Sequence, residues 1–318
     1  MSRNWIRACN LIVSGSQGFK DLAALRVVFS IKQWSLQAPN MASFRVYNPA
    51  PDTVKALKAK EFTKVEFYAG YQDNVGLVYS GEIKQTRSGH ETAVDSFVDL
   101  FCADGETGYN QARVTKTLAA GWTPQDKLDV AIKAFQPFGI TLGLNALDLS
   151  QPKAPRGLPL IGMARDVIRQ VVMSKGGVWS IQQGKVKAVP KSLETGQSDT
   201  VTMNGHTGMI GWPEQTEDGI VVRSLLNPKL QPLMKLKIDP SAILEAEQNN
   251  NPQQSTQGIA QNQNLLQQQL GAGTYTIFHL DRFGDTRGAE WTDECTCIGQ
   301  GGYLSKANQD AGYSLGFS

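Results

Sequence analysis

Alternating hydrophobic and polar residues mark the first hundred positions of the chain as a series of short β-strands. In residues 26–32 every second residue is hydrophobic, which is the period of a strand with one buried face. A short helix capped by Asp52 or Thr53 and running to Leu57 is expected between two of the strands. Four further segments show the strand pattern: 42–47, 64–71, 76–83 and 92–101. Together they predict a compact antiparallel barrel or sandwich.

The spacing of hydrophobic residues lengthens to that of a helix in the middle of the chain. Thr123 and Pro124 predict a helix start, because a capping hydroxyl precedes a proline at the first helical position. A second helix is predicted over residues 160–175, ended by a Gly-Gly pair, and residues 178–189 predict a hairpin packed on both helices. Residues 111–198 are therefore expected to form a small α/β module.

Strand patterns return in residues 199–318, interrupted by one polar insertion. A turn is expected at Gly284 and Asp285, and residues 247–270 are rich in Gln and Asn, a composition too polar to build a core. The predicted strands are 200–203, 220–226, 234–238, 273–280 and 294–298. With residues 1–110 as a first domain and 199–318 as a second, the fold class expected is α+β, mainly β, with two antiparallel β domains flanking the module.

The composition argues against a nucleic-acid-binding protein and against a membrane-spanning one. Of the 318 residues 41% are hydrophobic and 19% charged, and the net charge of +2 is spread along the chain without a run of Lys and Arg. A dedicated nucleic-acid-binding surface is therefore not expected. No stretch reaches the roughly 18 to 20 apolar residues that span a bilayer. Polar residues interrupt positions 1–14, so no signal peptide is expected, and synthesis in a cytoplasm is predicted.

Two motifs could suggest a bound ligand, and both have a simpler interpretation. Cys295 and Cys297 would share one face of a strand, but two ligands do not make a metal site. Buried, reduced thiols are the expectation for both, and for Cys9 and Cys102. Residues 14–18 are glycine-rich but lack the spacing and the lysine of a phosphate-binding loop, which predicts a turn or linker.

The candidates for catalysis are weak. On one strand His279 and Asp281 would share a face, as a general base and its orienting acid do, and Asp285, Glu290 and Asp293 follow nearby. No motif marks a serine or cysteine beside them, and acidic residues are ordinary in turns. A second set of carboxylates that resembles a glycosidase pair is expected on a solvated strand face: Glu61, Glu66 and Glu82. No catalytic, cofactor-binding or metal-binding residue is predicted.

Aromatic residues in the first domain could form a stacking platform for sugars or bases. They are Trp34, Tyr47, Phe67, Tyr68, Tyr71 and Tyr79. Half of them fall at positions expected to face a core, and no basic residues interleave with them. Core packing is the favoured interpretation, followed by an oligomer interface and then by ligand stacking.

Several passages, in order, resemble the baseplate hub proteins of contractile-tailed bacteriophages. After the strand at 27–31 come Pro-Asn-x-x-x-x-Arg-Val-Tyr-Asn-Pro at 39–49, a strand ending in Ala-Gly-Tyr at 69–71 and a strand ending in Ser-Gly-Glu-Ile at 80–83. Near the other end, residues 284–291 are similar to the Gly-Asp-Thr-Arg-Gly-x-x-Trp turn of the same hubs. Residues 220–232 look like the strand and proline turn of their second β domain.

The resemblance implies a structural protein. Hubs of this family carry two tail-tube-like β-barrel or sandwich domains per chain and form a homotrimer, a pseudo-sixfold ring that connects the tail tube to the central spike and lines the DNA channel. It also implies possible contacts with tape measure and baseplate wedge proteins. The expected location is the tail baseplate of the virion, assembled in the cytoplasm of the host bacterium. No enzymatic activity and no cofactor are implied, and the DNA is expected to pass without specific binding.

Two alternatives stay open. The chain could be the hub of a related contractile injection machine, or a tail-associated cell-wall hydrolase or carbohydrate-binding component that uses His279 and Asp281. The residues predicted to contact partners are Tyr68, Tyr71, Asp285, Thr286 and Arg287, although ordinary turn and core roles would explain the same residues.

Overall fold

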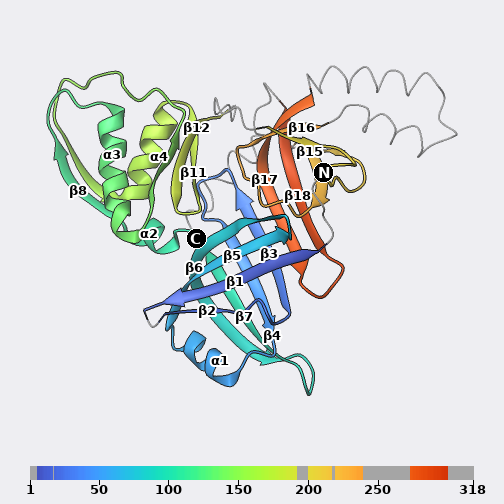
Figure 1. The fold of residues 1–318 in the computed structure, drawn as a ribbon. Helices are drawn as coiled ribbons and strands as arrows, with labels where there is room; N and C mark the ends of the chain where they lie inside the picture. The colour runs from blue at the N-terminus through green and yellow to red at the C-terminus, as the bar shows by residue number, and fades with distance from the viewer. Residues whose placement is uncertain (1–5, 17, 192–199, 217–218, 239–272, 300–318) are drawn as a thin grey trace, which may run out of the picture.

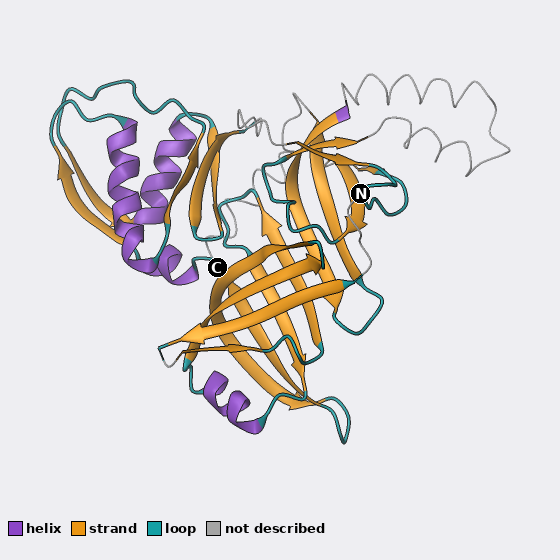
Figure 2. Cartoon of the chain, viewed as in Figure 1, coloured by secondary structure: helices purple, strands orange, loops and turns teal. Residues whose placement is uncertain are grey.

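Strands dominate the chain, and three of the four α-helices of the described residues lie in its middle part (Figures 1 and 2). The computed structural model describes residues 6–16, 18–191, 200–216, 219–238 and 273–299. The predicted α+β fold, mainly β, is confirmed. The Gln-rich insertion predicted at 247–270 lies outside the described residues.

The first β unit comprises seven strands and one helix. They are β1 (Arg7–Gly15), β2 (Gly18–Asp21), β3 (Val27–Trp34), β4 (Met41–Tyr47), α1 (Pro51–Lys58), β5 (Phe62–Tyr71), β6 (Asn74–His90) and β7 (Ser96–Ala103). The glycine-rich segment at 14–18 is the connection of β1 to β2, in which Gly15 pairs with Gly18. It is therefore a hairpin turn, as predicted.

Helix α1 begins earlier than predicted. Its N-cap is Ala50 rather than Asp52 or Thr53. Pro51 takes the first helical position, where its missing N–H removes no helical hydrogen bond. The buried Thr53 instead accepts a hydrogen bond from the ammonium of Lys20 on β2.

Strand β6 bends the first unit into two layers. Its residues 74–82 pair with β5, and its residues 82–90 pair with β7. The layers enclose one apolar core, in which the ring of Phe67 lies 4.7 Å from that of Phe29 and 5.1 Å from that of Phe44. Because one long strand belongs to both layers, the alternation of side chains along β6 sets which residues face that core.

The helical module follows. Its elements are α2 (Glu106–Gln111), β8 (Arg113–Leu118), α3 (Pro124–Phe135), a 3-10 turn η1 (Gln136–Phe138), β9 (Thr141–Asn145), β10 (Leu158–Met163), α4 (Ala164–Ser174), β11 (Gly177–Gln182) and β12 (Lys185–Pro190). Helices α3 and α4 pack together and share an apolar core with the adjoining strands. β12 pairs antiparallel with β11 and parallel with β9.

The sequence predicted the start of α3 correctly but not the start of α4. Thr123 caps α3 as predicted, in a reciprocal pair of hydrogen bonds with Asp126. The second helix begins at Ala164 rather than at residue 160, so that prediction was wrong. Residues 158–163 form β10 instead and pair with β8, because Pro159 and Gly162 disfavour a helix and β8 offers a free edge.

The second β unit contains β13 (Thr200–Met203), β14 (Glu214–Thr216), β15 (Gly219–Leu225), β16 (Lys235–Ile238), β17 (Thr274–Asp285) and β18 (Trp291–Gly299). The turn between β17 and β18 lies beyond the predicted Gly284 and Asp285. Gly284 is still paired with Trp291, so the strand continues through Asp285. Pairing with β18 therefore keeps Gly284 in the strand, although a Gly-Asp pair by itself favours a turn.

A single ladder joins the two β units. Residues 279–285 of β17 pair antiparallel with residues 28–34 of β3. The main sheet is therefore continuous, in the order β14-β15-β18-β17-β3-β4-β7-β6-β5-β1-β2, with β16 and β13 attached through β17. Over the described residues this path is open, and neither unit closes as a barrel. Of the two predicted shapes, barrel and sandwich, the sandwich describes the fold better. The outer edge of β3 pairs with β17 of the other unit, so it does not close the first unit into a barrel.

Buried polar groups attach the module to the first unit. The side-chain amide of Asn40 donates to the backbone oxygen of Ile181 (3.0 Å) and to Oε1 of Gln182 (2.8 Å). The Asp104 carboxylate accepts hydrogen bonds from the backbone N–H groups of Gln183 and Gly184. The turn between β11 and β12 is thereby held against the end of β7.

Gly284→Ala is expected to destabilise the protein. An added Cβ would lie 2.4 Å from Cζ of Phe29 and 2.9 Å from Cε3 of Trp291, both in buried rings that pack at the joint. We expect the free energy of unfolding in urea to fall by about 1–3 kcal/mol, the usual cost of overpacking. Gly205→Ala is the matched control, since nothing lies within 4 Å of its Cβ position. Equal effects of the two substitutions would contradict the packing argument.

Asp104→Asn is expected to change how stability depends on pH. Burial raises the pKa of Asp104 to about 6, despite the two hydrogen bonds from backbone N–H groups. Because the folded-state pKa lies above that of the unfolded chain, the stability contributed by protonation is present below about pH 4 and lost as the pH rises through about 6. Between about pH 5 and 7.5 the wild type should lose about 1–2 kcal/mol relative to the variant. Parallel curves of unfolding free energy against pH would show that this carboxyl does not titrate in that window.

Candidate assembly surface

One side of the main sheet is continuous across both β units. Strands β14, β15, β18, β17, β3, β4, β7 and the second half of β6 lie side by side, and successive residues point alternately to the cores and away from them (Figure 1). We call the side away from the cores the sheet face. Its side chains include Ser30, Lys32, Met41, Ser43, Arg45, Gln85, Arg87, Phe101, Arg223, Asp281, Thr292 and Glu294.

A row of three charges crosses β4, β7 and β6. Asp99 lies between Arg45 and Arg87, with an oxygen 2.7 Å from a nitrogen of each guanidinium. Burial of Asp99 would raise its pKa, but the hydrogen bonds from the two arginines outweigh burial and lower it. Two guanidinium groups share this one carboxylate, and Arg45 also lies 3.6 Å from Glu91.

A second row of charges crosses the joint of the two units, with two carboxylates between two cations. Lys32 of β3 is opposite Asp281 of β17, Asp281 is opposite Glu294 of β18, and Glu294 is opposite Arg223 of β15. The Arg223 guanidinium lies 2.8 Å from the Glu294 carboxylate. Together the two rows present four cationic and three anionic side chains, so the sheet face is close to neutral and carries both signs.

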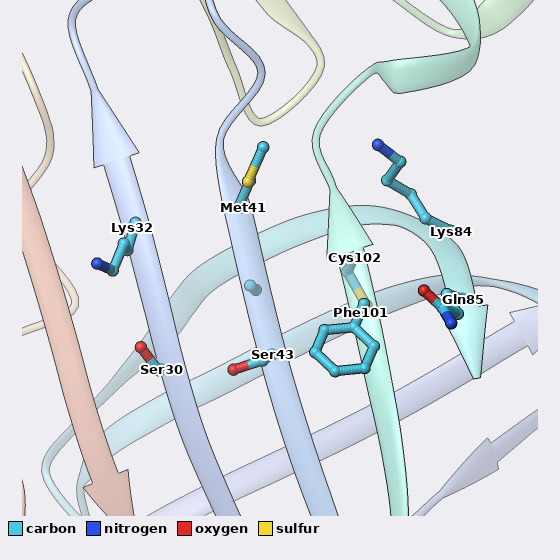
Figure 3. Close-up of a pocket in the computed structure, with 9 residues that line it drawn as sticks. Ser30, Lys32, Met41, Ser43, Lys84, Gln85, Phe101 and Cys102 are labelled. Carbon is cyan, nitrogen blue, oxygen red and sulfur yellow. The ribbon is translucent and has the colours of Figure 1, made fainter. Parts of the chain in front are cut away.

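Between the rows the sheet face has a shallow apolar pocket (Figure 3). Met41 and Phe101 are its large hydrophobic side chains and are 55% and 37% exposed, which is unusual for such residues. Lys84 is at its edge, where the ammonium pairs with Glu106 at 2.7 Å. The remaining lining residues are Ser30, Lys32, Ala42, Ser43, Gln85 and Cys102. A surface of this kind suits protein contacts better than the binding of one small polar ligand.

Of the residues predicted to contact partners, three form one fixed turn. The Asp285 carboxylate accepts hydrogen bonds from Arg26, which lower the pKa of Asp285. The Thr286 hydroxyl oxygen accepts from the backbone N–H of Val27 at 2.9 Å, and the Arg287 side chain donates to a backbone oxygen at 3.1 Å. The turn is therefore rigid and ends the ladder between β3 and β17.

The two predicted tyrosines lie on β5, in the other layer of the first unit. Tyr68 is half-buried and donates its hydroxyl hydrogen to Glu66 at 3.0 Å, whereas Tyr71 is only 4% exposed. Arg7 connects Tyr71 to the turn, because it is opposite Tyr71 in the β1–β5 ladder and donates to the backbone oxygens of Gly288 and Ala289. The structure thus brings Tyr71 near the turn and leaves Tyr68 away from it.

The carboxylates considered for catalysis do not gather into one site. Nε2 of His279 lies 3.1 Å from Oδ1 of Asp281, and the imidazole stacks on the Trp34 ring at 3.7 Å. Asp293 points to the opposite, core side, where it lies 3.9 Å from Arg282 and burial raises its pKa to about 6. Among the hydrogen bonds of the described residues, none joins His279 to a hydroxyl or thiol.

The second carboxylate set is dispersed as well. Glu66 binds Tyr68, Glu82 accepts from the backbone and hydroxyl of Thr107, and Glu61 is exposed at the surface. Burial raises the pKa of the Cys295 and Cys297 thiols, which disfavours the thiolate form that binds metals. Within the described ranges no group of three His, Cys, Asp or Glu is placed to hold a metal ion.

Sequence reasoning did not identify the sheet face. Arg45, Arg87 and Asp99 are far apart along the chain, and only the register of the ladders places them in one row. The available signal was the alternation in residues 42–46, where Ser43 and Arg45 separate three apolar residues, whereas residues 85–89 carry no such alternation.

Comparison with solved structures gives the same fold over nearly the whole chain. A 43 kDa tail protein of a prophage from Shewanella oneidensis is 6% identical, with a TM-score of 0.56, and the match covers 92% of this chain and 97% of that one. A tail protein from Neisseria meningitidis is 9% identical, with a TM-score of 0.56 over 94% and 98% of the two chains. The chain has the fold of phage tail proteins.

A third match comes from a secretion machine. A component of the type VI secretion system of Escherichia coli, described as similar in structure to two tail proteins of bacteriophage T4, is 10% identical. Its TM-score is 0.53 over 88% of this chain and 76% of that one. No protein-family model matches the sequence, and no curated protein matches it. The predicted resemblance to tail hub proteins is thus confirmed through the fold.

The helices of the described residues are short, since α3, with 12 residues, is the longest of them. In the part of the chain that the structure describes, no helix has the length and apolar character needed to cross a bilayer.

Proposed function

We propose that this protein is the baseplate hub of a contractile phage tail, a structural component without enzymatic activity. Three copies form a pseudo-sixfold ring that connects the tail tube to the central spike. Tape measure and baseplate wedge proteins are further candidate partners. The ring is assembled in the host cytoplasm and remains in the virion.

The observation that carries the proposal is the joining of two β units through one ladder, in a chain matched end to end by tail proteins. Two β units per chain and three chains give six units around an axis. A ring of this kind can meet a sixfold tube on one side and a threefold spike on the other. The match to a secretion-system component supports, as a second candidate, the hub of a related contractile injection machine.

The sheet face suits the lining of the DNA channel. Its cationic and anionic side chains nearly balance, and Asp99 neutralises part of the charge of Arg45 and Arg87. Affinity for DNA depends mainly on the number of phosphates that Lys and Arg neutralise. A lining of mixed charge lets DNA move through without holding it.

The purified protein should form a ring of three chains. Light scattering over a range of concentrations should approach three times the chain mass of 34.7 kDa, and negative-stain images should show a central opening. A stable dimer would contradict the proposal. So would a chain that stays monomeric both alone and with its tube and spike proteins.

Asp99→Asn should convert the sheet face into one that binds DNA. The substitution leaves the Arg45 and Arg87 guanidinium groups without their shared carboxylate. We expect the variant to bind a short duplex more tightly than the wild type, with a salt slope steeper by up to about one unit per added phosphate contact. Fluorescence anisotropy at several salt concentrations measures both quantities.

The control for this measurement is Asp52→Asn, which makes the same charge change on the exposed surface of α1. Equal tightening by the two variants would show that net charge, and not the sheet face, determines binding.

A further inference from the structure

The helical module is strongly basic. Residues 106–191 contain twelve Lys and Arg residues and five Asp and Glu residues, which gives a net charge of +7, whereas the rest of the chain sums to −5. The even spread of charge expected from the sequence therefore does not hold. The basic residues of the module are separated along the chain, so no run marks them, but few carboxylates stand between them. A charge imbalance of this size within one part of a protein favours an acidic partner.

The carboxylates of the module do not neutralise its cations. Among the ion pairs of the described residues, one includes a cation of the module, Arg169 with Asp166 at 3.5 Å. Asp126 is used in the cap of α3, and Glu106 pairs with Lys84 of the first β unit. The positive charge of the module is therefore available to a partner.

Four of these cations lie on one two-stranded ribbon. β8 and β10 pair antiparallel, and backbone hydrogen bonds continue the pairing beyond them, from Gly121 to the oxygen of Ala154 and from Ala154 to the oxygen of Trp122. We call residues 113–122 and 153–163 the outer ribbon. It contains no Asp or Glu. Its cations are all exposed: Arg113, Lys116, Lys153 and Arg156.

Trp122 fixes one end of the outer ribbon and brings a fifth cation to it. The indole N–H donates to the backbone oxygen of Arg156 at 2.9 Å, and the ammonium of Lys127 lies 5.5 Å from the centroid of the Trp122 ring. Further along the ribbon, Ile161 is opposite Thr115 and is 80% exposed. Cations around an exposed apolar side chain suit a protein partner that offers both carboxylates and apolar groups.

The outer ribbon lies away from the sheet face. The β11–β12 turn holds the module to the first β unit, and β8 lies on the far side of α3 and α4 from β11 and β12 (Figure 1). Under the proposed function the sheet face lines the channel, so DNA in the channel does not meet the ribbon. A protein outside the channel is the partner that this position favours.

We propose that the outer ribbon binds an acidic segment of another protein of the tail. The segment lies along the ribbon, with its carboxylates near the ribbon cations and an apolar side chain on Ile161. This inference rests on the proposed function, which places the ribbon outside the channel. Opposite charges steer such an association and fix its register. Because the cations are exposed, salt should screen the attraction.

A labelled peptide of alternating Glu and Leu is the probe, and the full-length protein is the receptor. Fluorescence anisotropy should show binding at low salt that weakens as salt is added, and no binding of the same peptide with Gln in place of Glu. Lys116→Glu combined with Lys153→Glu should raise the dissociation constant about tenfold or more, because the new carboxylates repel those of the peptide.

Two further variants make the measurement specific. Lys64→Glu combined with Lys229→Glu is the matched control, since it makes the same charge change at exposed lysines of the two β units. Ile161→Ser tests the apolar part of the contact. It should weaken binding of the peptide about fivefold and leave any binding of a short DNA duplex unchanged.

Three results would overturn the proposal. Equal losses in the two double variants would show that net charge alone determines binding. Tighter binding of duplex DNA than of the peptide, lost in the ribbon variant, would make the ribbon a nucleic-acid surface. A lower mass of the assembly by light scattering in the ribbon variant alone would make the ribbon a contact between copies.

The same samples separate this proposal from the hub function. A protein that forms the trimer but does not bind the peptide would overturn the ribbon proposal and leave the hub ring standing. A protein that binds the peptide through the ribbon but forms a stable dimer would support the ribbon proposal and contradict the hub ring.

Discussion

The ladder between β3 and β17 is the interaction on which the rest of the structure depends. It joins strands more than 240 residues apart and turns two small β units into one sheet. Its contacts go beyond the backbone: the Phe29 and Trp291 rings meet edge to face at 5.2 Å, and Arg26 binds Asp285 at the end of the ladder. Without this pairing, each unit would have a separate face and no common surface would exist.

The two sides of the common sheet separate the residues considered for catalysis. The cores take the apolar residues of each strand, and the alternate residues on the sheet face form ion pairs across neighbouring strands. His279 and Asp281 belong to this face, whereas Asp293 belongs to the core with Arg282. Residues that are close in sequence thus lie on opposite sides of the sheet. A surface of small polar groups, paired charges and exposed hydrophobic residues such as Met41 and Phe101 is suited to contact with large partners.

The module depends on the first unit in a different way. Asn40 and Asp104 hold the β11–β12 turn through buried hydrogen bonds, while α3 and α4 keep their own apolar core. A small apolar cluster also joins the module to both β units, where Val178 and Val189 pack with Leu36, Leu233, Phe278 and Ile298. The module is thus attached without adding a strand to the main sheet. The matches to tail proteins cover 92% and 94% of the chain, so they extend over most of the module.

The sequence by itself determined most of the elements, because local patterns decide them. Alternation identified β3 to β6, and the Thr123-Pro124 pair identified the start of α3. Alternation did not identify β1, β2, β9 or β14. It also missed β8 and β10, which pair with each other although at least 40 residues separate the paired positions. Only the tertiary structure decided the order of the strands, the open sheet and the charged rows. Register and pairing between distant strands are set by how two cores pack together, and that information is not contained in any single segment.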